Sequence, residues 1–265
     1  MPQASQDRPL DKGVAPAAKP KSFYIGYNKA IPRTLRPFLM TFAAVLVGVF
    51  AMVALLISRN INDPGNGDYD ADLMLAGTLI VSPAPILRVA ADAQYPHPHA
   101  LMLTGEGKEG VLASATALAG KHVTISGTLL RRGSIDMLVT APQSIQPAPT
   151  SEGTASLPNA VSLGRWRLSG EICDGKCTTG AMRPGTGLAH KACANLCIFG
   201  GIPPVFVSTS PVDGVSFFLL TGKDGTALPQ NLYDLTALRV EIEGEILKLD
   251  DLLILQTDLK TARKL

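Results

Sequence analysis

The hydrophobic pattern contains one long apolar run, and the other apolar runs are short. Residues from Pro37 to Ser58 carry no charge and show no polar face, and Arg36 and Arg59 flank them. A helix of this length is roughly 33 Å long, which matches a hydrocarbon core of about 30 Å. A signal peptide has a shorter apolar region and a small-x-small cleavage site, whereas this sequence continues LLISRNINDP. We therefore predict an uncleaved transmembrane helix over residues 37–58.

The charges on the two sides of this run differ. Residues 1–36 carry seven Lys and Arg, whereas the other side has Arg59 followed by acidic residues in a predicted linker at 59–72. Because positive flanks stay in the cytoplasm, we expect a single-pass protein of the inner (cytoplasmic) membrane with a cytoplasmic N-terminus. Its C-terminal domain would lie in the periplasm. Residues 1–36 have few large apolar residues at their start and are predicted to be a disordered cytoplasmic tail.

Beyond the linker, short apolar or alternating runs are separated by Gly, Pro and Asp, a pattern typical of a mainly β structure. A short helix is predicted at Val111–Leu118. The pattern divides the region into a first β unit at 73–142, a polar linker at 143–163 and a second β unit at 164–260. In the first unit the predicted strands are Leu73–Ile80, Ile86–Val89, Ala100–Thr104, His122–Leu130 and Ile135–Thr140.

The second β unit repeats the first. Residues 101–140 align without a gap with residues 218–257 at a constant offset of 117, and alternation stays in phase, so the same faces point inward. Near the start of each copy, Leu75-Ala-Gly77 matches Leu168-Ser-Gly170 at an offset of 93. The difference between 117 and 93 means that 24 residues are inserted into the second copy. We predict two tandem OB-like small β-barrels.

OB-folds often bind nucleic acids or sugars. A net charge of +2 and an aromatic content of 5% provide neither the positive surface nor the stacking platform of a nucleic-acid binder. We therefore expect no nucleic-acid partner.

The insertion, at about 174–200, is the one stretch with candidate chemistry. It begins directly after Cys173 and contains the other three cysteines of the chain together with His190. Residues Leu188–Phe199 are predicted to form a helix capped by Thr186 and ended by two glycines. Positions 190, 193 and 197 then share one helix face. The candidate site residues are Cys173, Cys177, His190, Cys193 and Cys197.

Three kinds of chemistry fit this set. An even number of cysteines in an oxidising compartment favours two disulfides, one from each of Cys173 and Cys177 to Cys193 or Cys197, with no cofactor. A metal site is the alternative, in which the thiolates and His190 would hold zinc, copper or an iron–sulfur cluster. A redox-active thiol pair is the third.

Other polar residues indicate no catalytic site. His97 and His99 lie in a Pro-rich segment predicted to be a solvated loop, and His122 is predicted to be an exposed strand residue. Asp250 and Asp251 fit an ordinary hairpin turn. The sequence shows no catalytic triad, P-loop or dinucleotide fingerprint that would indicate an enzyme.

The pattern KCxxGxMxPGxGxxHxxCAxxCIxGGIPP, Lys176 to Pro204, resembles a segment of uncharacterised membrane-anchored bacterial proteins. The resemblance implies an association with membrane redox enzymes and assigns no catalytic role to any residue. We expect a non-enzymatic accessory subunit, or stabiliser, of a membrane respiratory or redox complex, with the membrane and a protein of that complex as partners. The alternatives are a metal-binding or electron-transfer protein and a thiol–disulfide oxidoreductase.

Overall fold

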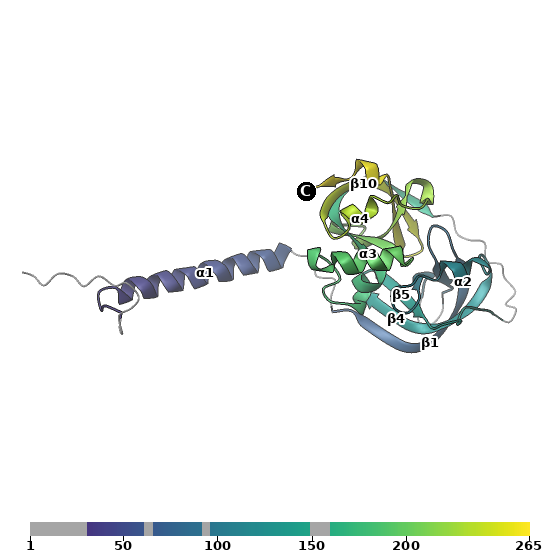
Figure 1. The fold of residues 1–265 in the computed structure, drawn as a ribbon, viewed down its shortest axis with the longest axis horizontal. Coiled ribbons are helices and arrows are strands. Elements are labelled where there is room, and N and C mark those ends of the chain that lie inside the picture. The colour runs from purple at the N-terminus through teal and green to yellow at the C-terminus, as the bar shows by residue number, and fades with distance from the viewer. Residues whose placement is uncertain (1–30, 61–65, 92–95, 149–159) are drawn as a thin grey trace, which may run out of the picture. The chain divides into compact units, whose positions relative to one another are not determined.

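The structure is a computed structural model that describes residues 31–60, 66–91, 96–148 and 160–265. The chain forms two compact units, Met1–Ile61 and Asn62–Leu265. The first unit contains helix α1 (Arg36–Asn60) (Figure 1). Over the described ranges, α1 is the one helix long and apolar enough to cross a membrane, with a mean hydropathy of 2.7. Most of the predicted disordered tail lies outside the described residues.

The second unit begins with a closed five-stranded barrel. Its strands are hydrogen-bonded in the order β1-β2-β3-β5-β4, and β4 pairs back with β1 to close the sheet. β3 and β5 are parallel and the other pairs are antiparallel. The elements are β1 (Asp68–Ile80), β2 (Ile86–Val89), β3 (His99–Thr104), α2 (Leu112–Thr116), β4 (His122–Arg132), β5 (Ile135–Thr140) and β6 (Gln146–Pro147), which extends the sheet beside β4.

A second closed barrel has the same strand order, β7-β8-β9-β11-β10, and β10 pairs back with β7 to close the sheet. β9 is parallel to β11. β4 and β10, β5 and β11, and β6 and β12 each begin 117 residues apart, as the sequence repeat predicts. The mainly β fold with two small barrels is therefore confirmed. The elements are β7 (Val161–Asp174), β8 (Pro204–Val212), β9 (Val215–Gly222), η3 (Lys223–Gly225), α4 (Leu232–Leu235), β10 (Arg239–Leu249), β11 (Leu252–Thr257), η4 (Leu259–Thr261) and β12 (Arg263–Lys264).

Glycines that recur in both copies allow neighbouring strands to approach closely. A Cβ on Gly127 would lie 2.2 Å from the Val139 carbonyl oxygen, and one on its counterpart Gly244 would lie 2.4 Å from the Gln256 carbonyl oxygen. Any larger residue would push the paired strands apart. The repeated glycines thus allow the same close strand pairing in both barrels.

Each barrel encloses its own apolar core, as the in-phase alternation of the two copies predicts. Equivalent side chains fill the two interiors, for example Leu101 and Phe218, which are both fully buried. The first core contains mainly Leu79, Leu87, Leu101, Leu103, Val123, Ile125, Leu129 and Leu138. The second contains mainly Ile172, Phe206, Phe218, Leu220, Val240, Ile242, Ile246 and Leu255.

A third core lies between the barrels and is built from their outward-facing side chains. The contributing positions are equivalent in the two copies, so the interface has an approximate two-fold character. Pairs that are 117 residues apart include Ala100 and Phe217, Met102 and Leu219, Ile135 and Leu252, and Met137 and Ile254. The two barrels consequently share buried surface and form one compact unit.

Charged residues border this interface. Arg88 of the first barrel forms a bidentate pair with Asp250, with distances of 2.7 and 3.1 Å. His99 contacts Asp136 at 2.9 Å through Nε2 and Asp251 through Nδ1. The expectation that His99 lies in a solvated loop, and that the two aspartates are only turn residues, is therefore wrong, because the second barrel's β10–β11 turn docks on the first barrel.

Candidate functional site

The cysteine-rich insertion connects β7 to β8 through residues 175–203, whereas residues 81–85 make the equivalent connection in the first barrel. It contains η1 (Cys177–Ala181), the 3-10 turn η2 (Leu188–His190) and α3 (Lys191–Phe199). The predicted helix over 188–199 is present, with a tighter first turn, and it ends before Gly200. Thr186 does not cap it: Gly187 occupies that position and its backbone N–H donates to Glu171.

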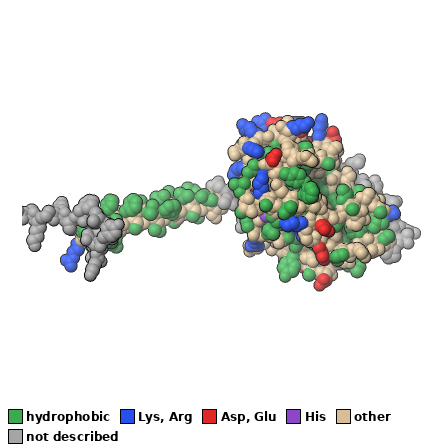
Figure 2. Space-filling model, viewed as in Figure 1, with side chains coloured by type: hydrophobic (Ala, Val, Ile, Leu, Met, Phe, Trp, Pro, Cys, Tyr) green, Lys and Arg blue, Asp and Glu red, His purple; other side chains and the backbone are tan. Residues whose placement is uncertain are grey.

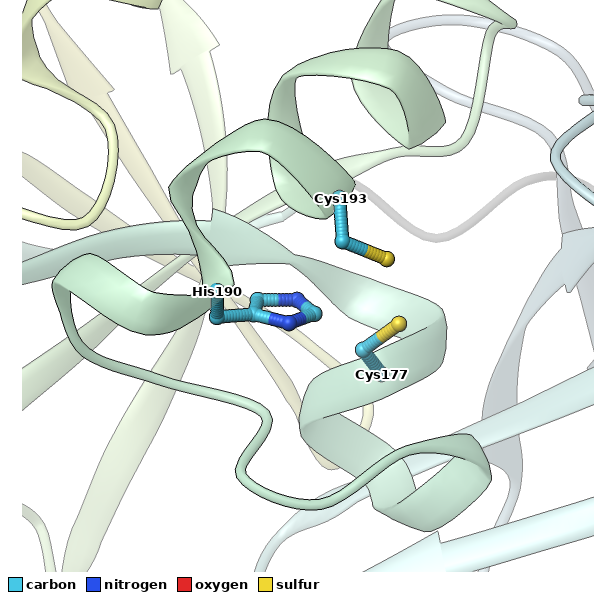
Figure 3. Close-up of side chains that lie close together, drawn as sticks. All are labelled: Cys177, His190 and Cys193. Atoms are coloured by element: carbon cyan, nitrogen blue, oxygen red, sulfur yellow. The ribbon is translucent and has the colours of Figure 1, made fainter.

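Three side chains of the insertion converge. The candidate ligand atoms of Cys177, His190 and Cys193 all lie within 4.8 Å of one another. Figure 3 shows the two thiols and the imidazole ring side by side, with Cys177 from η1 and the other two from the η2–α3 segment. A second group, Asp174, Cys177 and Cys197, meets the same 4.8 Å limit. Cys177 belongs to both groups and is therefore the centre of the cluster.

Asp174 fixes the orientation of the cluster from the end of β7. Its Oδ1 accepts a hydrogen bond of 2.8 Å from the backbone N–H of Cys177, which holds the first turn of η1. Its Oδ2 lies 2.9 Å from Nε2 of His190, and both side chains are buried. When Nε2–H donates to this carboxylate, Nδ1 retains a free lone pair. The arrangement matches the carboxylate–histidine pairs that orient metal-ligating imidazoles.

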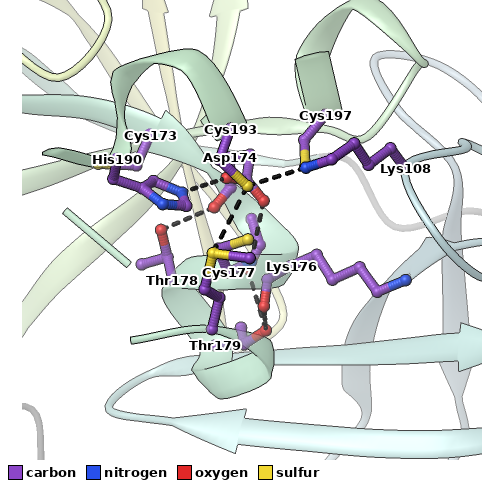
Figure 4. Close-up of polar contacts among 12 residues, drawn as sticks. Lys108, Cys173, Asp174, Lys176, Cys177, Thr178, Thr179, His190, Cys193 and Cys197 are labelled. Atoms are coloured by element: carbon purple, nitrogen blue, oxygen red, sulfur yellow. Dashed lines mark hydrogen bonds and ion pairs between the residues drawn. The ribbon is translucent and has the colours of Figure 1, made fainter. Parts of the chain in front are cut away.

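The first barrel contributes a cation to the cluster. Lys108 Nζ lies 2.9 Å from Sγ of Cys193 and 3.5 Å from Sγ of Cys197 (Figure 4). The hydrogen bond with Cys193 raises the pKa of Lys108. On the other side, the Met182 sulfur lies 3.6 Å from Sγ of Cys193. The cluster thus combines sulfur donors with a place beside Cys193 and Cys197 that holds the positively charged ammonium group of Lys108.

Hydrogen bonds attach the insertion to the backbone of the β3–α2 loop of the first barrel, residues 105–111. Lys176 Nζ donates to the Gly105 and Gly107 carbonyls at 2.8 and 3.0 Å. Gly110 N–H donates to the Gly200 carbonyl at 2.8 Å. A Cβ on Gly200 would lie 1.8 Å from the Lys108 carbonyl oxygen, so only glycine allows this approach. The site is therefore assembled from both barrels.

Burial acts against ionisation of the thiols when no cation is bound to them. Burial, followed by the charge of Asp174, raises the pKa of Cys177. Burial, Asp174 and Cys193 raise the pKa of Cys197 to about 11, although Lys108 opposes them. Thiolates and a carboxylate in one buried place require a compensating cation.

All four cysteines are free thiols, so the predicted pair of disulfides is wrong for this structure. The reason lies in the alternation along β7. Ile172 points into the barrel core, and Cys173 therefore points outward, where it is fully buried between the barrels and its thiol donates to Glu171 at 3.2 Å. Cys173 is thus not among the residues that converge on Cys177. The predicted bridge from Cys173 to a cysteine of α3 is therefore absent.

The donor set fits a single thiophilic metal ion. Tetrahedral zinc with sulfur ligands places neighbouring ligand atoms about 3.8 Å apart. In both groups the candidate ligand atoms are at most 4.8 Å apart, which exceeds that spacing by no more than about 1 Å. Thiolate and imidazole donors suit zinc and copper(I). An iron–sulfur cluster with four cysteine ligands is a poorer fit because Cys173 lies elsewhere. Cys177 could therefore hold a metal ion together with His190 and Cys193, or together with Asp174 and Cys197.

Sequence reasoning missed Asp174, Lys108 and Met182. The Asp174-x-x-Cys177 spacing is a turn signal, because an aspartate often accepts from a backbone N–H a few residues on. Lys108 is 85 residues from Cys193 and carries no local signal. Comparison of the chain with protein-family models, curated proteins and solved structures gives no match.

Proposed function

We propose that this chain is a membrane-anchored metal-binding accessory protein. One observation carries the proposal: Cys177, His190 and Cys193 lie within 4.8 Å of one another, and Cys177, Asp174 and Cys197 meet the same limit. Cys177, Cys193, Cys197 and His190 would bind zinc or copper(I), and Asp174 would orient His190. A thiophilic cation would neutralise the buried thiolates and take over the position of Lys108.

The remaining parts of the proposal rest on the sequence and the topology. The length and hydropathy of α1 support a single membrane span. The excess of Lys and Arg in residues 1–36 supports a cytoplasmic N-terminus and a periplasmic second unit. Five-stranded closure with the third and fifth strands parallel supports an OB-like identity for both barrels.

The metal site is tested on the full chain, purified in mild detergent and reduced. We expect the protein to bind one equivalent of Co²⁺ with a thiolate-to-cobalt charge-transfer absorption, and to retain zinc or copper in elemental analysis. Cys177→Ser removes the donor shared by both groups and should weaken binding more than about 100-fold, because even supporting residues of metal sites contribute about 10–100-fold. Cys173→Ala is the matched control, since Cys173 lies outside the cluster.

Two results would contradict the metal site: the absence of any thiolate–cobalt absorption, or equal metal retention in Cys177→Ser and the wild type. A third result, in which Cys173→Ala loses the metal and Cys177→Ser keeps it, would mean that the ligands are assigned to the wrong residues.

The accessory role comes from the sequence. The insertion occurs in only one copy of a duplicated unit, and the chain carries no recognisable catalytic set. Isolation in mild detergent should yield a stoichiometric partner from a membrane redox complex. Isolation of the protein alone, under conditions that preserve other membrane complexes, would contradict this role.

A further inference from the structure

The insertion presents an exposed apolar stripe. Leu188, Leu196 and Phe199 are 69%, 57% and 80% exposed, and exposed Ala192 lies between them. Their spacing of four, four and three residues places them on one face of the η2–α3 segment. Figure 2 shows hydrophobic side chains gathered over α3, with a basic side chain beside them. Soluble surfaces rarely expose such large apolar side chains together without a partner.

The opposite face of α3 is already used for folding. Ala194, Cys197 and Ile198 are buried, and Asn195 donates to the Tyr233 carbonyl at 3.1 Å. Most of the surface of the exposed stripe is therefore not used in packing among the described residues, and it needs another explanation.

The charge of the insertion is entirely positive. Residues 175–203 contain Lys176, Arg183 and Lys191 and no Asp or Glu. Lys176 and Lys191 donate to backbone carbonyls, whereas Arg183 is exposed and donates to the Asn66 carbonyl. An apolar face with basic flanks is the composition of helices that lie in a membrane interface.

The covalent tether limits how far the insertion can lie from the end of α1. Only residues 61–65 separate the last residue of α1, Asn60, from Asn66, and Asn66 is bound by Arg183 of the insertion. A Cβ on Gly67 would lie 3.6 Å from the Thr179 carbonyl, so the start of the second unit lies against η1. Six extended peptide links reach at most about 22 Å. If α1 spans a bilayer, Asn66, which Arg183 of the insertion contacts, cannot lie farther than this from the end of α1.

We infer that the exposed stripe formed by Leu188, Ala192, Leu196 and Phe199 rests in the interfacial region of the phospholipid bilayer that holds α1. The basic side chain of Arg183 then faces lipid phosphates. The inference rests on the anchor in the proposed function and not on the metal. Tethering strengthens the contact, because the apolar face is already held at the bilayer surface at high effective concentration. The cysteine cluster, on another face of α3, would be held close to the lipid headgroups.

The test uses the full chain in phospholipid nanodiscs whose acyl chains are brominated, because bromine quenches tryptophan only at close range. Phe199→Trp is made in a Trp166→Phe background, so that the protein contains one tryptophan, in the stripe. Leu112→Trp in the same background is the matched control, since Leu112 is a half-exposed leucine on a helix of the first barrel. The native protein, whose Trp166 lies on β7, gives a second reference.

We expect the tryptophan at position 199 to lose most of its emission in brominated nanodiscs, and those at 112 and 166 to keep theirs. Unquenched, red-shifted emission at position 199 would overturn the inference, since the stripe would then face water. Unquenched, blue-shifted emission that depends on protein concentration would overturn it in favour of a second copy covering the stripe. Release of the chain from membranes by alkaline carbonate would instead show that the anchor itself is wrong, a failure distinct from loss of quenching alone.

Discussion

The contact of His99 with two carboxylates makes the docking of the barrels dependent on pH. Nε2 lies 2.9 Å from Asp136, and Nδ1 contacts Asp251, whose Oδ1 also accepts from the Ala100 backbone N–H at 2.8 Å. Only an imidazolium donates from both nitrogens. Burial alone lowers the pKa of His99, but the hydrogen bonds and charges of Asp136 and Asp251 outweigh it and raise the pKa from 6.5 to about 9.

The magnitude follows from the linkage between protonation and folding. One pKa unit corresponds to about 1.4 kcal/mol, so a rise from 6.5 to about 9 contributes at most about 3.4 kcal/mol. The Asp251 side chain is 43% exposed, and screening by water reduces the value to about 2 kcal/mol. Because the folded state favours the protonated form, this contribution is fully present below pH 6.5 and is lost as the pH rises through about 9.

The assay is urea unfolding of the full chain in detergent, followed by Trp166 fluorescence, from about pH 6 to about pH 10. Thiols and lysines also titrate in this range, so the wild type is compared with His99→Gln, which keeps a hydrogen-bonding side chain and cannot be charged. The difference in unfolding free energy between the two proteins should shrink by about 2 kcal/mol across the range. Parallel stability curves would refute the reasoning, since the charged form of His99 would then have no preference for the folded state.

Two further substitutions test the packing between the barrels and under the insertion. Gly200→Ala should destabilise the protein by about 2–4 kcal/mol, because the new Cβ would lie 1.8 Å from the Lys108 carbonyl oxygen. It should also increase the rate at which the cluster thiols are alkylated, and an unchanged rate would contradict this. Leu219→Ala should cost about 2–5 kcal/mol of unfolding free energy by opening a cavity between the barrels. The control Leu112→Ala, at a half-exposed position, should change it by less than about 0.5 kcal/mol, and equal effects of the two substitutions would contradict the shared core.

The barrels could be predicted because their signals are local. The period-two alternation fixes which side chains face inward, and the repeat at 117 residues carries that alternation from the first copy to the second. The step in offset from 93 to 117 also located the insertion between β7 and β8. The apolar run of α1 needs only length and composition to be recognised.

The outer faces of the strands could not be predicted in the same way. Met102 and Met137 point away from their own barrel, and alternation alone assigns such positions to solvent. They are fully buried because the second barrel covers them. That covering also pairs Arg88 with Asp250, 162 residues away, and no local pattern encodes such a contact.

The cysteine site likewise has features that local sequence predicts and features that depend on tertiary packing. By itself the sequence determined that Cys193, Cys197 and His190 share a helix face, because helical spacing is local. Only the tertiary structure decided that Cys173 is sequestered between the barrels, that Asp174 holds His190, and that Lys108 from the other barrel meets the thiols. The physical reason is that side-chain direction follows from backbone periodicity, whereas the atoms a side chain meets depend on how separate elements pack.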